Sequence, residues 1–443
     1  MVVSYLQDLK NYDVLVFILP PHWPKIPPLS IIYLENFLRS KGVKAKAVDL
    51  NILFFQLFKN EQKDWLKLNS NFEENLFSQI KQREHILLDE IISNIVDSNA
   101  KILAFSVFAR NRRTTIDFVR LLSQKEKKKL FVFGGPEILF EYFRDKFFAE
   151  LQIPRSYFVL GEGELALLYL VKNKEDKFAL HNNKRLISYE EIENLDELPL
   201  IDFDSLDFKS YSPKVIPLLS SRGCIKKCCF CSEYKNYSSF RQHSVSYVIN
   251  QITHLKEKYK LNTFSFQDSL INSNLKWLDE FCSQIINNNI EIKWEAQIAI
   301  RPEMDIRIFL KMKESGCFNL FVGLESACDK ILRDMKKGYN KNQAKIFFRK
   351  MIDANLHFEI SLITGFPSET ETDFQETLNF IKENKAIIPK IAQINPFVSY
   401  PPSDVNKKVD RITAISRVEK LVSLLKEERI KFTSAYINNL LSK

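Results

Sequence analysis

The chain has 443 residues, enough for two or three domains. With 45% hydrophobic and 27% charged residues it can bury large cores, which excludes an intrinsically disordered chain. Its net charge of +9 is spread along the sequence, so we expect no nucleic-acid partner. No apolar run reaches the roughly 18 residues of a membrane span, and the polar start of the chain, with Asp8, Lys10 and Asp13, is unlike a signal peptide. These features predict a cytoplasmic protein without a membrane span.

The N-terminal half alternates predicted strands with predicted helices. Leu29 to Arg39 and Thr114 to Leu122 carry apolar residues at helical spacing. The predicted strands are continuous apolar runs, typical of strands buried on both faces: Asp13 to Leu19, Val43 to Leu50, Lys101 to Val107, Leu130 to Phe133 and Tyr157 to Leu160. The alternation predicts a doubly wound, Rossmann-like parallel sheet over residues 1–170, with a helical insertion at about 51–100. Residues 171–213 lose the pattern and are predicted to be a linker.

Glycine is scarce, with only 10 residues, yet pairs of glycines follow two of these strands. Gly134 and Gly135 follow one strand, and Gly161 and Gly163 follow another. Because ligands bind beyond the carboxyl ends of strands in such sheets, these glycines favour close approach of backbone to a bulky ligand. Tight turns without a ligand are the alternative. No Gly-x-Gly-x-x-Gly follows the first strand, which disfavours a nicotinamide or flavin dinucleotide.

All seven cysteines lie in the second half of the chain, and four of them fall within eight residues. Cys224, Cys228 and Cys231 have the spacing Cys-x3-Cys-x2-Cys. Three thiolates on one loop can hold three irons of an iron–sulfur cluster and leave a fourth iron open for chemistry. A structural zinc site is the alternative, but it needs a fourth ligand, and the nearest histidine, His243, is twelve residues further on.

The second half again alternates helices with short strands, so residues 214–402 are predicted to form a partial barrel of parallel strands. Helices are predicted over Leu275 to Ile286 and Asp373 to Glu383. A helical tail is predicted at residues 403–443, amphipathic from Asp410 to Ser442, with VEKLVSLLKEERI as its clearest stretch. The predicted strands are Val215 to Leu219, Thr263 to Phe266, Ile292 to Gln297, Phe318 to Val322, Glu359 to Ile363 and Ile391 to Ile394.

The motif Cys-x3-Cys-x-aromatic-Cys resembles the signature of the radical S-adenosylmethionine (SAM) superfamily. The resemblance implies a partial (β/α)6 barrel and a [4Fe-4S] cluster on Cys224, Cys228 and Cys231, whose open iron binds the amino and carboxylate groups of SAM. It further implies SAM contacts from Phe230 near the adenine, Asp268 near the amino group, Glu325, and Gly365 beside the adenine. Arg301 either neutralises the SAM carboxylate or caps the barrel rim. Cys229 is outside the motif.

A doubly wound domain before such a barrel resembles the cobalamin-binding subgroup of this superfamily. The matching segments include PPLSIIYLENF, FSVFARNRRT, FGGPE and VLGEGE. The resemblance implies that cobalamin is held by the loops after the strands, with contacts from Leu29, Ser106, Gly134, Gly135, Gly161, Glu162 and Gly163. The Asp-x-His-x-x-Gly motif that supplies an axial histidine elsewhere is absent, and His22 is the only nearby candidate, so we expect a cobalt without a histidine below it.

The resemblance implies an enzyme that cleaves SAM to a 5′-deoxyadenosyl radical and uses cobalamin as a methyl carrier to methylate an unactivated carbon. The alternatives are a cyclisation or rearrangement, a radical SAM enzyme without bound cobalamin, and a non-catalytic cobalamin or iron–sulfur binding protein. The expected partners are a small-molecule or peptide substrate and a reductant such as flavodoxin or ferredoxin. No residue pattern identifies the substrate or a catalytic side chain.

Overall fold

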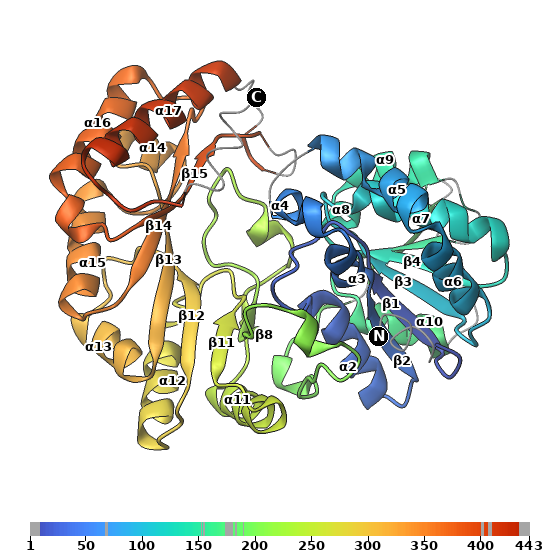
Figure 1. The fold of residues 1–443 in the computed structure, drawn as a ribbon. Helices are drawn as coiled ribbons and strands as arrows, with labels where there is room; N and C mark the ends of the chain where they lie inside the picture. Colours follow the sequence, from blue (N-terminus) through green and yellow to red (C-terminus); the bar gives the residue numbers. More distant parts are fainter. Residues whose placement is uncertain are drawn as a thin grey trace. The chain divides into compact units, whose positions relative to one another are not determined.

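The computed structural model describes residues 9–66, 70–151, 153, 156–172, 180–181, 184–188, 190–399, 403–405 and 410–433. The chain divides into two compact units, Met1–Val215 and Ile216–Lys443, called the N-terminal and C-terminal units below. Each unit is built around one main sheet (Figure 1). The predicted α/β class, with two parallel sheets and a helical C-terminal part, is confirmed.

The N-terminal unit has a seven-stranded sheet in the order β2-β1-β3-β4-β5-β7-β6. The strand order reverses after β1, and right-handed crossovers therefore send helices to both faces, with α2 packed against α10 and α7 packed against α5 and α9. The strands are β1 Val14–Ile18, β2 Ala45–Asp49, β3 Ile102–Ser106, β4 Leu130–Gly134, β5 Ser156–Leu160, β6 Leu180–His181 and β7 Lys184–Ser188. The helices are α2 Leu29–Ser40, α3 Leu50–Leu57, α4 Gln62–Trp65, α5 Ser70–Arg83, α6 His85–Val96, α7 Arg112–Lys125, α8 Pro136–Leu139, α9 Glu141–Leu151 and α10 Glu164–Lys172.

A row of phenylalanines crosses this sheet and forms the centre of the core. Ring centroids of Phe17 and Phe105 lie 5.2 Å apart, those of Phe105 and Phe133 5.4 Å, and those of Phe133 and Phe158 5.6 Å, all stacked. These residues come from four neighbouring strands, so each ring covers the next one along one face of the sheet.

Part of the predicted linker belongs to the first sheet, which corrects that boundary. β7 pairs in parallel with β5, and the two-residue β6 pairs antiparallel with β7. β6 is the edge strand, and β7 lies next to it. Both strands are short and contain basic residues, so they lack the apolar run by which the other strands are recognised. From residue 190 the segment continues with two short 3₁₀ turns, Leu195–Glu197 and Phe208–Ser210.

Glu35 in α2 is a buried carboxylate of this unit and makes its stability depend on pH. Its side chain accepts a hydrogen bond from Ser205, and the residue is 1% exposed. Burial raises the pKa of Glu35 to about 7, with the Ser205 bond opposing that shift. The folded pKa of Glu35 exceeds its unfolded value. The contribution of Glu35 to the free energy of unfolding is therefore fully present below about pH 4.5 and is lost as the pH rises through about 7.

We expect Glu35→Gln to remove this pH dependence. In urea unfolding, the free energy of unfolding of the variant, relative to that of the wild type, should rise by about 2 kcal/mol between pH 5 and pH 8. Each unit of pKa shift corresponds to about 1.4 kcal/mol. Glu74→Gln, which changes a half-exposed glutamate of α5, is the control and should leave the pH profile unchanged. An equal difference at both pH values would show that Glu35 does not titrate in this range.

The C-terminal unit has a six-stranded parallel sheet in the order β15-β14-β13-β12-β11-β8, with helices along its outside (Figure 1). The strands are β8 Ile216–Leu218, β11 Thr263–Phe266, β12 Lys293–Ile298, β13 Cys317–Glu325, β14 Phe358–Thr364 and β15 Ile391–Pro396. A separate ribbon pairs β9 Ser221–Arg222 with β10 Arg241–Gln242. The helices are α11 Val245–Tyr259, α12 Leu275–Asn287, α13 Ile306–Glu314, α14 Asp329–Asp334, α15 Lys341–Asp353, α16 Glu371–Glu383 and α17 Arg411–Glu427.

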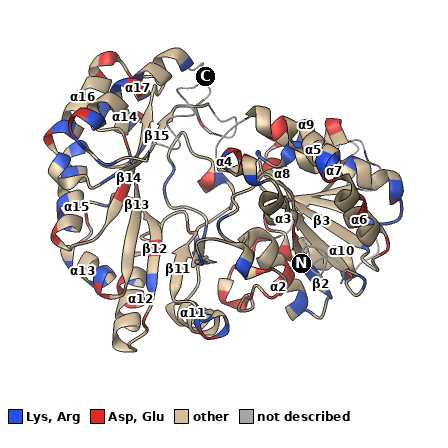
Figure 2. Ribbon diagram, in the orientation of Figure 1, with Lys and Arg blue, Asp and Glu red and all other residues tan. Residues whose placement is uncertain are grey.

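Charged residues of both signs are interspersed on the helices of both units, for example on α13, α15 and α16 (Figure 2). In the described part of the chain, no helix is both long and apolar enough to span a membrane.

The tail helix α17 docks on the end of β14. The Thr364 hydroxyl donates to the Ala414 carbonyl at 2.9 Å, and the buried Arg417 guanidinium donates to the Glu369 carboxylate at 2.7 Å. A side chain on Gly365 would collide with Ala414, so a glycine is needed for this close approach. The described part of the predicted tail therefore packs on the barrel, while the expected helix beyond residue 433 lies outside the described residues.

Candidate functional site

The three motif cysteines lie on a loop that is fixed at both ends. The ribbon of β9 and β10 closes residues 223–240 into a loop. Gly223 has φ +86°, and a Cβ there would meet the Ser239 carbonyl oxygen at 2.7 Å, so the loop closes only with glycine at this point. Within the loop, the Cys231 amide donates to the Cys228 carbonyl at 3.1 Å, and the Glu233 amide donates to the Cys231 sulfur at 3.4 Å.

Cys224, Cys228 and Cys231 line one cavity of about 320 Å³ in the C-terminal unit. The rest of its wall comes from strand ends and from the loop before α15. Apolar residues and charged residues share this wall: Lys226, Phe230, Glu233, Gln267, Ser269, Leu270, Gln297, Ile298, Ala299, Ile300, Phe321, Gly323, Glu325, Lys337 and Tyr339. Such a cavity, apolar with a few fixed charges, is typical of a small-molecule site.

The residues around the three thiols bear on whether they hold a cluster or a zinc ion. The three cysteines line one cavity, and its wall holds no histidine and no fourth cysteine among the described residues. A structural zinc site needs a fourth Cys or His ligand. His243, the other candidate zinc ligand, stacks on Tyr247 and is outside the cavity wall. The arrangement therefore suits separate irons of a cluster better than one zinc ion.

Without a metal, two of the three motif thiols, those of Cys224 and Cys231, are held protonated. Burial raises the pKa of Cys231 to about 11 and also raises the pKa of Cys224. Metal binding must displace these protons, since thiolates are the ligands. Cys229 points elsewhere: its thiol donates to the Asp334 carbonyl at 3.1 Å and packs against Met335. Its place in the sequence, adjacent to Cys228, thus does not make it a fourth ligand.

A fixed pair of opposite charges lines the same cavity as the thiols. Lys337 Nζ lies 3.3 Å from Glu325 Oε1, and both side chains are nearly buried. Burial lowers the pKa of Lys337, but Tyr339 and Glu325 raise it by more, so the ammonium stays charged. Tyr339 donates its hydroxyl hydrogen to the Leu324 carbonyl at 2.8 Å, and burial raises its pKa. Glu325 was predicted from the sequence, whereas Lys337 and Tyr339 were not.

Phe230 and Glu325 are the two predicted SAM residues that line the cavity. Asp268 is fully buried behind it and accepts hydrogen bonds from Ser220 and Ser221, while its neighbours Gln267 and Ser269 line the wall.

Arg301 and Gly365 are also outside the cavity wall. The Arg301 guanidinium donates to the carbonyls of Asn272 and Ser273 at 2.6 and 2.8 Å, which is the barrel-rim alternative considered for it. Gly365 faces Ala414 of α17 instead of an open site. This geometry therefore gives no support for a SAM contact by Arg301 or by Gly365.

Glu233 is a further cavity residue that the sequence analysis missed. It lies two residues after Cys231, and Ser269 donates a hydrogen bond to its carboxylate at 3.3 Å. Burial raises the pKa of Glu233. Its position next to the motif is the one signal by which it could have been found.

The predicted cobalamin residues lie at the carboxyl edge of the first sheet. Ser106 and Gly134 end the adjacent strands β3 and β4, and the Ser106 hydroxyl donates to Ser30, next to Leu29, at 3.0 Å. Gly161 has φ +87° and open space around the missing side chain. This strand edge therefore offers open backbone at Gly161, as a bulky ligand requires.

Three other predicted cobalamin residues are explained by contacts within the protein. A Cβ on Gly135 would meet the Val107 carbonyl oxygen at 2.7 Å, and one on Gly163 would meet Leu34 at 2.9 Å. Glu162 accepts a hydrogen bond from the Ile192 amide at 3.0 Å. Close packing accounts for the two glycines whether or not a ligand is bound.

His22 follows β1 at the same edge. Its ring centroid lies 4.8 Å from that of Phe108, and its backbone amide donates to Asn51 at 2.8 Å. Burial, and then the charge of Arg110, lower the pKa of His22 to about 4, so the ring is neutral at neutral pH.

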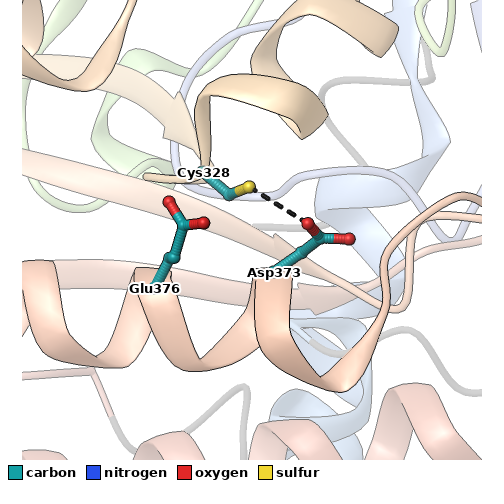
Figure 3. A group of neighbouring side chains, drawn as sticks. All are labelled: Cys328, Asp373 and Glu376. Atoms are coloured by element: carbon teal, nitrogen blue, oxygen red, sulfur yellow. Dashed lines mark hydrogen bonds between the residues drawn. The ribbon is translucent and has the colours of Figure 1, made fainter.

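A second group of ligating side chains, Cys328, Asp373 and Glu376, lies within 4.8 Å in the described part of the chain (Figure 3). The Cys328 thiol donates to Asp373 at 3.4 Å. Lys330 Nζ lies 2.5 Å from Asp373, and Lys341 Nζ lies 2.9 Å from Glu376. Because two ammonium groups already neutralise the carboxylates, this group is a hydrogen-bond network instead of a metal site.

Sequence comparison identifies the part of the chain that carries the three cysteines. Residues 218–381 match the model of the radical SAM superfamily. The chain is 30% identical to the uncharacterized methyltransferase PH0819 of Pyrococcus horikoshii over 245 residues, which are 51% of this chain and 52% of that protein. The match thus spans about half the length of this relative.

Structure comparison extends the likeness to both units. The cobalamin-dependent SAM radical enzyme OxsB, solved with aqua-cobalamin and SAM bound, matches with a TM-score of 0.67 and 17% identity, covering 95% of this chain and 56% of OxsB. The radical SAM methyltransferase TsrM of Kitasatospora setae, solved with cobalamin and a [4Fe-4S] cluster, matches with a TM-score of 0.64 and 14% identity, covering 92% of this chain and 75% of TsrM. Residues 218–381 are therefore a radical SAM domain, in a chain that shares the fold of cobalamin-dependent radical SAM enzymes.

Proposed function

We propose that this chain is a radical SAM enzyme whose N-terminal unit binds cobalamin and whose product is methylated at an unactivated carbon. The observation that carries the first part is the single cavity lined by Cys224, Cys228 and Cys231 together with Glu325 and Lys337. The second part is supported by the likeness in fold to two cobalamin-containing enzymes and by the open backbone at Gly161.

The donor set fits the cofactors. Three thiols in one cavity, with no histidine or fourth cysteine in its described wall, suit a [4Fe-4S] cluster with one iron left for SAM. When bound, the cluster supplies the electron that cleaves SAM to methionine and a 5′-deoxyadenosyl radical, and cobalamin supplies methyl transfer. A ferredoxin or flavodoxin would deliver that electron, and a small molecule or peptide would be the substrate.

The side chains of the cavity have roles that follow from their chemistry. The amino group of SAM has N–H donors and its carboxylate is an anion, so Glu233 and Glu325 are suited to accept from the amino group and Lys337 to pair with the carboxylate. Phe230 offers an aromatic face for the adenine. Leu270, Ile298 and Ile300 make that side of the wall apolar, which excludes water from a reactive radical.

Anaerobic purification with cluster reconstitution tests both parts of the proposal. We expect corrin absorbance in the holoenzyme, 5′-deoxyadenosine on reduction with SAM, and transfer of a labelled methyl group from SAM to metabolites or peptides. Bound corrin without 5′-deoxyadenosine would contradict an enzyme of this class. 5′-Deoxyadenosine without corrin would contradict the cobalamin mechanism, and an unlabelled, rearranged product would favour a cyclase or mutase.

Two glycine variants test the corrin edge with a matched control. Gly161→Gln should lower the corrin content several-fold, because the new side chain enters the open space beyond β5. Gly42→Gln is the control, since Gly42 has a similar φ of +80° and equally open surroundings but precedes β2, at the opposite edge of the sheet. Equal loss of corrin in both variants would point to backbone strain and would remove this support for the site.

A further inference from the structure

Lys337 is held at the cluster cavity by a short loop between α14 and α15. Lys336 and Gly338 on either side have φ of +57° and +77°, so the chain turns sharply around this residue. The ammonium nitrogen lies 5.6 Å from the ring centroid of Phe230 and 5.9 Å from that of Tyr339. Since Phe230 stands between Cys228 and Cys231 in the sequence, the charge lies against the loop that carries the thiols.

Glu325, the partner of Lys337, is also held in one position by its surroundings. Glu325 has φ +65°, and the pairing of β13 with β14 shifts register between Gly323 and Glu325. Such a bulge re-aims a side chain, and a non-glycine residue in this conformation is strained. Ser361 donates to the second carboxylate oxygen at 3.1 Å. A Cβ on Gly323 would collide with this carboxylate and would lie 3.5 Å from Lys337 Nζ, so glycine leaves room for the pair.

A pair of opposite charges fixed in a nearly buried wall acts on a cluster through its electric field. One-electron reduction adds negative charge to the cluster, and nearby charges and hydrogen bonds tune the potentials of such clusters. A cation stabilises the reduced form, and an anion destabilises it. In a water-poor cavity these effects are screened less than at the surface.

We propose that Lys337 and Glu325 set the reduction potential of the cluster in opposite directions, Lys337 raising it and Glu325 lowering it. Both act as tuning residues whose effect on the cluster does not require SAM. This inference rests on the proposed cluster at Cys224, Cys228 and Cys231, and it adds a role that the ligand set alone does not contain.

The test is a redox titration of the reconstituted holoenzyme without SAM, in which electron paramagnetic resonance measures the amount of reduced cluster. At a fixed solution potential, Lys337→Gln should lower the ratio of reduced to oxidised cluster about tenfold, which corresponds to a midpoint lower by about 59 mV for a one-electron couple. Glu325→Gln should raise the ratio by a similar factor. The double variant should return close to the wild type, because it removes both charges.

Lys227→Gln is the matched control, since it removes a charge from an exposed position on the same loop and should change the ratio less than twofold. Unchanged midpoints, or shifts of the same sign in both single variants, would overturn the inference. If Lys337→Gln binds no iron, the midpoint potential of Glu325→Gln is the deciding measurement. A midpoint that is not raised in Glu325→Gln then overturns the inference. A wild-type protein that binds no iron would instead refute the proposed function, so the two failures are distinguishable.

Discussion

Cys228→Ala is expected to lose its cluster and, with it, reductive cleavage of SAM. Removing a residue that only supports a metal ligand costs about 10–100-fold in affinity, so losing a direct ligand should cost roughly a hundredfold or more. Iron content after anaerobic reconstitution and the 5′-deoxyadenosine formed on reduction are the two measurements. Both should fall to background in the variants of Cys224, Cys228 and Cys231 alike.

Cys229→Ala is the control, because it removes a neighbouring thiol that is not a proposed ligand. Cys229 adjoins Cys228, but its thiol bonds to the Asp334 carbonyl and its neighbours are apolar. Its removal should cost about 1–2 kcal/mol of stability, in the range of a lost buried hydrogen bond, and should leave the iron content unchanged. If Cys229→Ala also lost its iron, or if Cys228→Ala retained it, the ligand set would be different from the one proposed.

The buried strands could be predicted from the sequence because parallel strands covered on both faces must be apolar throughout. β1 and β3 therefore appear as unbroken runs, and the predicted ranges agree with Val14–Ile18 and Ile102–Ser106 within a residue or two. β6, the edge strand, and β7 next to it were missed because both are short and contain basic residues, so they carry no such pattern. The cysteine loop could be recognised because its three ligand positions are close in the sequence.

The rest of the cavity could not be predicted from local pattern. Lys337 lies more than a hundred residues after the motif and reaches the cavity only through the fold of β13 and α14. Gly365 shows the opposite case, since its expected open face is taken by Ala414, about fifty residues further along the chain. Such contacts between distant residues decide which of several suitable side chains faces a site.

Asp268 is a predicted SAM residue that does not line the cavity, although both of its neighbours do. β11 ends at Phe266, and successive side chains of an extended chain point to opposite sides. Gln267 and Ser269 face the cavity, so Asp268 between them faces the interior, where it accepts two bonds from the Ser220 amide at 3.1 and 3.0 Å and one from the Ser220 hydroxyl at 2.7 Å. Its role in this geometry is to anchor the chain just before the cysteine loop.

Asp268→Asn separates this anchoring role from direct contact with SAM. The amide has one acceptor oxygen in place of two, so a buried donor of Ser220 or Ser221 loses its partner and the unfolding free energy should fall by about 3 kcal/mol. Iron content should fall with it, because Ser220 and Ser221 begin the loop that ends in the ligands. The fraction that retains its cluster should bind SAM with wild-type affinity, since the carboxylate is outside the cavity wall.

Gln267→Ala is the matched control, because Gln267 lines the cavity and anchors no part of the cysteine loop in the described contacts. It should keep the wild-type iron content and lose less than about 1 kcal/mol, as expected for a side chain at a solvent-accessible wall. The decisive comparison is SAM affinity measured on cluster-loaded protein. A weaker affinity in Asp268→Asn with unchanged stability and iron would mean that the carboxylate turns to SAM on binding, as the family resemblance implies. Lower stability with unchanged affinity would mean that Asp268 contributes to catalysis solely by holding the cluster loop in place.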